Sequence, residues 1–346
     1  MAAGAGAARG RALGERGVVR VAGEGARGFL QGLVTNDVAA GLGAGGAGGA
    51  GAGVAYAGLL NGRGRFLHDL VLYDAGALER RLGLPAGAAG KGDAVLADVP
   101  AWSAGALVRL LRMYRLRRPV EVDDVSSDFR AWQLFPPVPA PGALGAGPPL
   151  GLGPPTLAVE SGWFPDPRLP ALGFRTLAPR GIVPPGAEEG GSCAGFRALR
   201  FALGVAEGDR EIPSGEALPL EFNLDALNGV SFSKGCYVGQ ELTARTHFKG
   251  VIRKRLMPVV LKRGDDGEGA STAAPGDAVR LEGRRRPVGR LLAVDGERGL
   301  ALLRLQPVLE AASRDEACLV EGSGASLTAA RPAWWPTSWG REEDGI

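Results

Sequence analysis

Residues 233–241 read SKGCYVGQE, and this stretch carries the densest chemical signal in the sequence. Gly235 and Gly239 flank Cys236, and glycine permits a tight turn or the close approach of another backbone segment. A helix is expected to begin after Gly239. A thiol just before a helix N-terminus, with Lys234 beside it, has its thiolate form favoured, and a nucleophile or a metal ligand needs a thiolate. The stretch therefore predicts a functional cysteine, with a free thiol that fills a turn as the alternative.

Few other residues could complete a metal site with this thiol. The chain has three cysteines and two histidines: Cys193, Cys236, Cys318, His68 and His247. Cysteine ligands usually come in close pairs, and these cysteines lie far apart in sequence. We therefore expect a partner to supply the remaining ligands if Cys236 binds a metal. A Cys236–His247 dyad is a weaker alternative, because no third group that would orient the imidazole is evident.

Bulk properties describe a globular chain. Its 346 residues allow two or three domains, and 45% are hydrophobic. The apolar runs are broken by Arg, Gly or Pro and fall short of the roughly 18 residues of a membrane span. The net charge of +3 does not call for nucleic acid. Basic stretches at 109–118 and 245–255 lack the aromatic residues of RNA-binding motifs, although they could grip carboxylates or phosphates.

The scattered, odd number of cysteines indicates a reducing compartment. Residues 1–13 contain Arg9 and Arg11 and no acid, which is typical of a mitochondrial leader, although the segment is short and lacks serine. Tracts rich in glycine, alanine or proline are predicted to be mobile loops because they bury little apolar surface. These tracts are residues 41–53, 136–155 and 184–191.

Hydrophobic periodicity predicts an α+β fold with antiparallel sheets, because strands and helices alternate without a steady βαβ order. Asn61-Gly62 is a hairpin signal between two of the strands. Strands are expected at 18–21, 54–60, 65–73, 94–99, 120–122 and 130–135, and helical segments near 29–38, 103–116 and 195–203.

The pattern changes near Gly250, where we place a domain boundary. Short strands at 251–261, 278–282, 288–294 and 300–305, separated by turn residues, fit a small β-barrel or sandwich. The expected organisation is two α+β lobes over 14–250, a barrel over 251–332 and a tail over 333–346.

The motif at 234–241 resembles the K-G-C-x-x-G-Q-E signature of YgfZ-like proteins, which belong to the superfamily of folate-binding aminomethyltransferases. In this signature the predicted site residues are Lys234, Gly235, Cys236, Gly239, Gln240 and Glu241. The resemblance extends over nearly the whole chain from about Gly17 and is closest to the branch that assembles mitochondrial iron–sulfur clusters. Further matching segments lie at 29–37, 60–69, 114–118, 166–168, 218–224, 243–245, 253–255 and 334–336.

This resemblance implies an aminomethyltransferase-like fold of three lobes around a central channel, in which Tyr56, Asp69 and Arg200 match residues that line a tetrahydrofolate site. The thiol of Cys236 is a departure from the aminomethyltransferase. The branch implies late maturation of four-iron proteins in the mitochondrial matrix. Cys236 would then be one ligand of a cluster shared with an A-type scaffold protein and destined for client four-iron proteins.

Two other functions stay open on the sequence. Asp69 is the main argument for a folate-dependent one-carbon transferase, and the basic stretches are the only support for an accessory role in RNA modification. One-carbon transfer to folate needs no thiol. Cys236 therefore favours an assembly factor without turnover of its own, with no membrane partner and no nucleic-acid partner expected.

Overall fold

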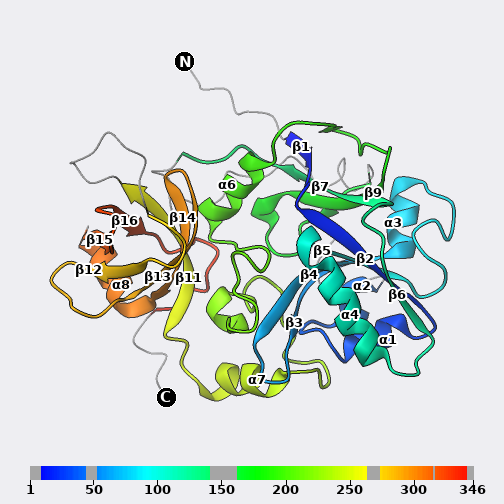
Figure 1. Ribbon diagram of the computed structural model, residues 1–346, viewed down its shortest axis with the longest axis horizontal. Helices are drawn as coiled ribbons and strands as arrows, with labels where there is room; N and C mark the ends of the chain where they lie inside the picture. The colour runs from blue at the N-terminus through cyan, green and yellow to red at the C-terminus, as the bar shows by residue number, and fades with distance from the viewer. Residues whose placement is uncertain (1–8, 44–52, 141–161, 263–272, 315, 341–346) are drawn as a thin grey trace.

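The computed structural model describes residues 9–43, 53–140, 162–262, 273–314 and 316–340. Three sheets organise this part of the chain, and all strand pairs are antiparallel except the one between β1 and β10. Two of the sheets pack together, while the third forms a separate barrel at the opposite end of the molecule (Figure 1). This arrangement confirms the predicted α+β class and the C-terminal barrel.

The first sheet has the order β3-β4-β5-β2-β6 and is covered on one face by helices. Successive side chains of β4 point to opposite faces, as strand geometry requires. Leu70 and Leu72 therefore pack under the helices, while Asp69 and Val71 lie on the other face. Its elements are β2 (Arg16–Gly23), β3 (Val54–Leu60), β4 (Phe66–Asp74), β5 (Val95–Pro100), β6 (Val120–Asp124), α1 (Ala26–Gln31), α2 (Val38–Leu42), α3 (Ala75–Leu82) and α4 (Ala104–Arg115).

The second sheet has the order β10-β1-β7-β9-β8 and packs against the inner face of the first. Apolar side chains such as Leu96 of the first sheet and Leu177 of the second belong to one shared core. Its elements are β1 (Arg9–Ala12), β7 (Phe129–Phe135), β8 (Phe164–Pro165), β9 (Phe174–Pro179), β10 (Ala187–Glu188) and α6 (Ala194–Leu203).

The third sheet closes into a six-stranded barrel with its own apolar core. The indole of Trp335 is part of this core, and the indole N–H of Trp334 donates to the carbonyl of Leu203 in α6 (2.8 Å). Residues beyond 332 therefore help to join the barrel to the lobes. The barrel consists of β11 (Lys254–Lys262), β12 (Ala278–Leu281), β13 (Gly289–Asp295), β14 (Arg298–Arg304), β15 (Cys318–Val320) and β16 (Ser326–Ala329), with α8 (Leu305–Ser313).

Several described elements were not predicted from the sequence, among them β8, β9, β15, β16 and α8, and two further short strands lie in tracts for which no strand was expected. Ala187–Glu188, within a tract predicted to be a mobile loop, pairs with β1 as a parallel edge strand. β1 itself lies inside the segment predicted as a possible leader, so residues 9–12 contribute to the fold. The other two predicted loops, 41–53 and 136–155, fall mostly outside the described residues. Strand pairing requires only backbone groups, which is why glycine-rich composition did not reveal these strands.

Candidate functional site

The cysteine motif forms a loop that ends at the N-terminus of α7 (Gln240–Lys249), where the sequence predicted a helix to begin. Gly239 caps this helix with a left-handed φ of 79°, a conformation that glycine adopts without strain. A Cβ at this position would lie 2.4 Å from the carbonyl oxygen of Asn61 in the β3–β4 turn. Gly239 is therefore required both by its backbone conformation and by the close approach of the hairpin. At Gly235, by contrast, a Cβ would meet nothing within 4 Å.

Lys234 was expected to favour the thiolate of Cys236, but its ammonium group is engaged with backbone carbonyls. Its buried ammonium group donates to the backbone carbonyls of Gln31 (2.6 Å), Val34 (2.8 Å) and Asn36 (2.8 Å). Burial lowers the pKa of Lys234 to about 8, so the group is still charged at pH 7 and can donate three hydrogen bonds. Lys234 thus fastens the motif loop to the segment that follows α1.

Two distant segments that carry the family resemblance meet at this loop. Residues 31–36 receive the Lys234 ammonium, and the N–H of Val238 donates to the carbonyl of Gly32 (3.2 Å). The β3–β4 turn contacts Gly239 and α7 from the other side. The similarity of these distant segments has one physical explanation, because together they fix the backbone around Cys236.

The Lys234 tether leads to a stability prediction. We expect Lys234→Met to lower the free energy of unfolding by about 2–4 kcal/mol, because it leaves one buried and two partly buried carbonyls without their charged donor. Urea unfolding measures this change. Lys249→Met, at the exposed C-terminal turn of the same helix, is the matched control and should change stability little. Equal stability of the Lys234→Met variant and the wild type would contradict the role of the tether.

Cys236 is exposed on this fixed loop, whereas Cys193 is half-buried and Cys318 is buried in the barrel core. The next residue, Tyr237, anchors the loop with a buried ring, and burial raises its pKa to about 12. Gln240 and Glu241 form the first turn of α7. Glu241 is exposed there, at the end of the helix dipole that favours a negative charge.

The structure does not support the Cys236–His247 dyad. His247 lies in the last turn of α7, and its ring stacks on Phe232 with 3.6 Å between centroids. No group of three or more His, Cys, Asp or Glu side chains that could hold a metal ion occurs among the described residues. Cys236 is therefore an exposed thiol that belongs to no group of three or more such side chains in the described part of the chain.

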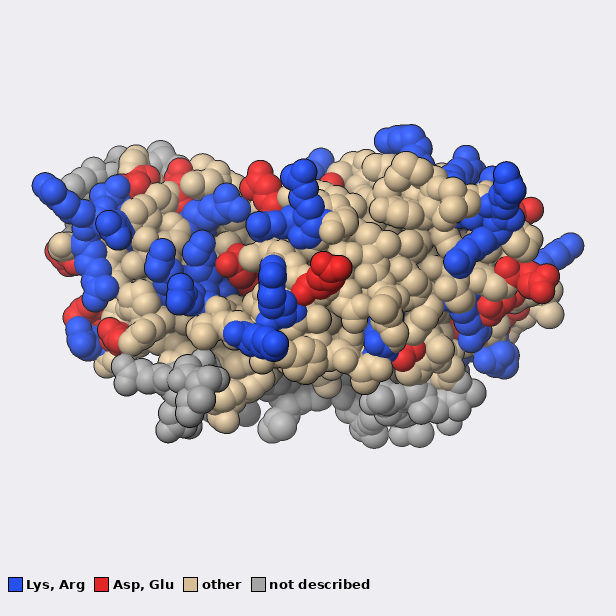
Figure 2. Space-filling view, turned by 90° about the horizontal axis from the view of Figure 1, so that it is seen from below, with Lys and Arg blue, Asp and Glu red and all other residues tan. Residues whose placement is uncertain are grey.

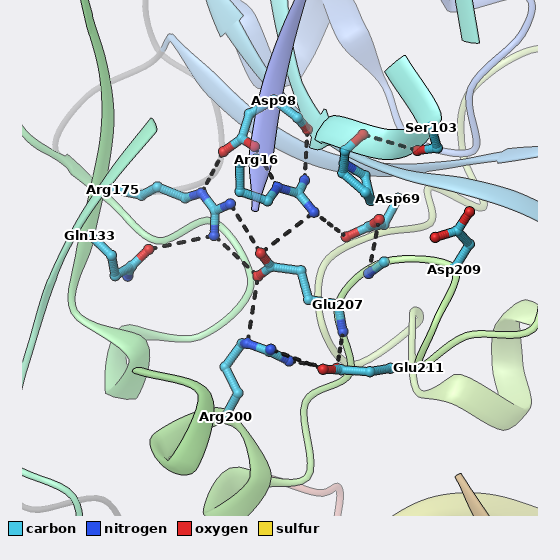
Figure 3. A network of polar contacts seen from close by, with 12 residues as sticks. Arg16, Asp69, Asp98, Ser103, Gln133, Arg175, Arg200, Glu207, Asp209 and Glu211 are labelled. Carbon is cyan, nitrogen blue, oxygen red and sulfur yellow. Dashed lines mark hydrogen bonds and ion pairs between the residues drawn. The ribbon is translucent and has the colours of Figure 1, made fainter. Parts of the chain in front are cut away.

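A second constellation, an ion network buried between the two sheets, surrounds Glu207 (Figure 3). The Glu207 carboxylate accepts hydrogen bonds from Arg168 (2.5 Å) and Arg175 (3.1 Å), and it lies 3.5 Å from Arg16. Burial alone would raise the pKa of Glu207, but the surrounding arginines hold it well below its usual value. The network comprises Arg16, Asp69, Asp98, Asp166, Arg168, Arg175, Arg200, Glu207 and Glu211.

The residues predicted to line a folate site lie in this region. Asp69 accepts a hydrogen bond from the N–H of Gly208 (3.2 Å). Burial raises the pKa of Asp69, although the nearby positive charge of Arg16 acts to lower it. Arg200 pairs with Glu211 (2.6 Å). Tyr56 lies beneath the guanidinium of Arg168, 5.8 Å from its ring centroid. These positions were predicted from resemblance alone.

The polar atoms of Asp69 and Tyr56 could bind a pterin, but the neighbouring cavity is small. Two buried polar atoms, Oδ2 of Asp69 and the hydroxyl of Tyr56, have no hydrogen-bond partner among the described residues, and a pterin edge carries N–H groups that a carboxylate accepts. Both side chains are only 1% exposed. The cavity that reaches Arg16, Arg200 and Glu207 has a volume of about 190 Å³, whereas ligand pockets usually measure about 300–1,000 Å³. This cavity is therefore small for a folate, and neither Asp69 nor Tyr56 belongs to its lining.

Most of this network was missed by the sequence analysis. Arg16, Asp98, Arg175 and Glu207 come from separate strands and loops, so no local motif joins them. Asp98 offered the one usable signal, because it interrupts the apolar run of a strand predicted to be buried, and a buried charge requires a partner.

Known proteins resemble this chain over most of its length. Residues 253–337 match the family model described as the CAF17 C-terminal beta-barrel domain. The chain is 37% identical over 331 residues to the iron-sulfur cluster assembly factor IBA57, mitochondrial, of Mus musculus, which covers 93% of this chain and 84% of that protein. The Homo sapiens protein of the same name is 38% identical over 333 residues with the same coverage. The chain belongs to the IBA57 family.

A more distant IBA57 homologue, from Mycosarcoma maydis, is 31% identical over 360 residues and covers 93% of this chain and 83% of that protein. All three IBA57 proteins are named as mitochondrial. No described helix is both long and apolar enough to cross a bilayer. Membership of the IBA57 family confirms the resemblance inferred from the cysteine motif.

Among solved structures, the glycine cleavage system aminomethyltransferase T of Bartonella henselae superposes with a TM-score of 0.61. The match covers 96% of this chain and 87% of that protein at 15% sequence identity. This likeness confirms the predicted aminomethyltransferase-like fold and carries no information about activity. This chain thus has the architecture of an aminomethyltransferase, with a cysteine motif placed beside α7.

Proposed function

We propose that this protein takes part in the maturation of mitochondrial iron–sulfur proteins, with Cys236 as one ligand of a cluster shared with a second protein. The observation that carries the proposal is an exposed thiol on a loop fixed by Lys234, Gly239 and Tyr237. Iron–sulfur clusters are held mainly by several cysteine thiolates. No group of three or more potential metal ligands occurs among the described residues, so in this proposal the remaining thiolates come from the partner.

The finer points of the proposal follow the family resemblance. The partner is an A-type scaffold protein, the cluster is delivered to client four-iron proteins, and the site of action is the mitochondrial matrix. The names of the related IBA57 proteins support the assembly role and the compartment. The protein acts here by binding and orienting a cluster, without a catalytic group of its own.

Visible absorbance of mixed proteins tests this function. The isolated chain should purify without colour, and mixing it with cluster-loaded A-type scaffold should give a complex with an altered cluster spectrum. Cys236→Ser should lose the spectral change. Cys193→Ser and Cys318→Ala should keep it, since neither thiol is freely exposed, and alanine spares the barrel core a buried hydroxyl. An unchanged response of Cys236→Ser would exclude the proposed ligand.

A role for tetrahydrofolate is a second proposal, favoured by the hydroxyl of Tyr56 and by Oδ2 of Asp69, which accept no hydrogen bond from the described residues, although Oδ2 lies 3.5 Å from Arg16. When bound, the folate would supply an amine that carries one-carbon units, while Asp69 would accept a pterin N–H. Calorimetric titration of tetrahydrofolate into the wild type and into Asp69→Asn tests this role. We expect any binding to be weakened at least about tenfold by the substitution, which removes a charged acceptor. Equal affinities, or no binding to either protein, would remove Asp69 from a folate site.

A further inference from the structure

The outer side of α7 has little cover from the rest of the protein. Of its ten residues, only Thr243 is buried. A helix on the surface of a globular protein normally buries an apolar stripe against the core. Here the helix instead lies at the lower edge of the molecule, directly after the cysteine loop (Figure 1).

Aromatic side chains connect the C-terminal end of α7 to the cysteine loop. Phe232, four residues before Cys236, stacks on His247, and both rings meet Phe248 edge-on with centroid distances of 6.0 and 4.8 Å. Phe248 is nevertheless 67% exposed. Exposed aromatic side chains that pack against other rings of their own protein are typical of the centre of protein–protein interfaces.

An adjacent groove continues this surface toward the barrel. It has a volume of about 370 Å³ and lies between α7, the 3-10 helix Pro219–Phe222 and the first residues of β11. Leu220 and Leu242 line its interior, and Val251, which is 51% exposed, lies at its edge. The groove is therefore large enough for an apolar side chain from another molecule.

Basic side chains line the groove where it meets the barrel. Arg253, Lys254 and Arg304 belong to its lining, and within the described residues none of them has a carboxylate within 4.0 Å. Glu221 is the one acidic residue of the lining. On this side of the molecule, Lys and Arg side chains also predominate over the barrel half (Figure 2). An occupant of the groove should therefore carry carboxylates near its apolar contact.

An interface of ordinary size that is centred on Cys236 would include this surface. A stable complex buries about 800 Å² on each partner, which corresponds to a disc of roughly 16 Å radius. A helix of ten residues extends only about 15 Å. A partner centred on a cluster at Cys236 would therefore cover α7 and reach the groove.

We propose that α7, with Phe232, Phe248, Val251 and the adjoining groove, is the docking surface for the protein that shares the Cys236 cluster. This inference rests on the proposed function. The partner presents an apolar side chain to the groove and carboxylates to Arg253, Lys254 and Arg304. We call this surface the α7 face.

Binding measurements with matched surface variants test the proposal. The probe is cluster-loaded A-type scaffold, titrated into Phe248→Ser/Val251→Ser and, as a charge test, into Arg253→Glu/Arg304→Glu. The controls are Met113→Ser/Leu116→Ser and Arg109→Glu/Arg117→Glu, which alter equally exposed apolar and basic side chains in and just after α4. Thermal unfolding of each variant checks that the fold is intact, and Cys236→Ser is titrated alongside.

We expect both α7-face variants to raise the Kd at least about tenfold and both controls to leave it within about twofold, a change of about 0.4 kcal/mol. The effect of the charge variant should shrink at high salt. If the α7-face variants bind like the controls while Cys236→Ser loses the cluster complex, the docking surface is wrong and the proposed function stands. If the α7-face variants weaken binding while Cys236→Ser keeps the cluster, the surface stands and the shared-ligand function is wrong.

Discussion

Cys236→Ala is expected to abolish the maturation of four-iron enzymes and to leave the free energy of unfolding within about 0.5 kcal/mol of the wild type. The thiol is exposed and its loop is fixed by other residues, so the side chain contributes little packing. On the proposed mechanism, its loss removes the ligand that Cys236 provides to the shared cluster. The measurement is the activity of a mitochondrial four-iron enzyme in cells that are depleted of the endogenous protein and express the variant.

The control for this experiment is Cys193→Ala, which removes a half-buried thiol next to α6. It should restore enzyme activity as well as the wild type does. Urea unfolding of both purified variants separates loss of function from loss of fold. Normal rescue by a well-folded Cys236→Ala protein would contradict the proposed mechanism.

The largest effect on stability is expected from Glu207→Gln. Glu207 lies within ion-pair distance of Arg16, Arg168, Arg175 and Arg200, all of which are almost fully buried at their side chains. Breaking a buried ion network by removing one partner costs about 3–5 kcal/mol, because the opposite charges stay buried. We therefore expect urea unfolding to show a loss of this size. Glu188→Gln, which breaks an exposed pair with Arg11, should cost less than about 1 kcal/mol.

The same carboxylate makes a prediction about pH. Its pKa in the folded protein lies well below the usual value, so its ionised form stabilises the fold at neutral pH. This contribution is fully present above the unfolded pKa of about 4.3 and is lost as the pH falls toward the folded value. The stability difference between the wild type and Glu207→Gln should therefore shrink below about pH 4. A difference that stayed constant down to pH 3 would show that the ionisation of Glu207 does not stabilise the fold.

Local sequence patterns predicted much of the fold. The Asn61-Gly62 hairpin, the helix α4, the start of α7 after Gly239 and four of the six barrel strands were anticipated, because turn chemistry and hydrophobic periodicity act over a few residues. The last two barrel strands, β15 and β16, were not predicted. The parallel pairing of β1 with β10 was missed. Those strands are two to four residues long and lie far apart in sequence, so their stability comes from tertiary packing.

For the candidate site, too, the local features were predicted and the contacts between distant segments were not. The thiol and Gly239 were identified from the motif, since glycine at a close backbone approach leaves a local signature. The direction of the Lys234 side chain was not, because its acceptors lie about two hundred residues earlier in the chain. The ion network around Glu207 likewise depends on which strands become neighbours, and sequence spacing alone does not contain that information.

Native mass spectrometry of the mixed proteins tests the central claim most directly. The chain and a cluster-loaded A-type scaffold are combined without oxygen, and the masses of the intact species are measured. We expect a species that contains one copy of this chain, the scaffold and a cluster, which Cys236→Ser fails to form and Cys193→Ser forms normally. A cluster retained by the isolated chain, or the same cluster-bound species with Cys236→Ser, would contradict a cluster shared through Cys236.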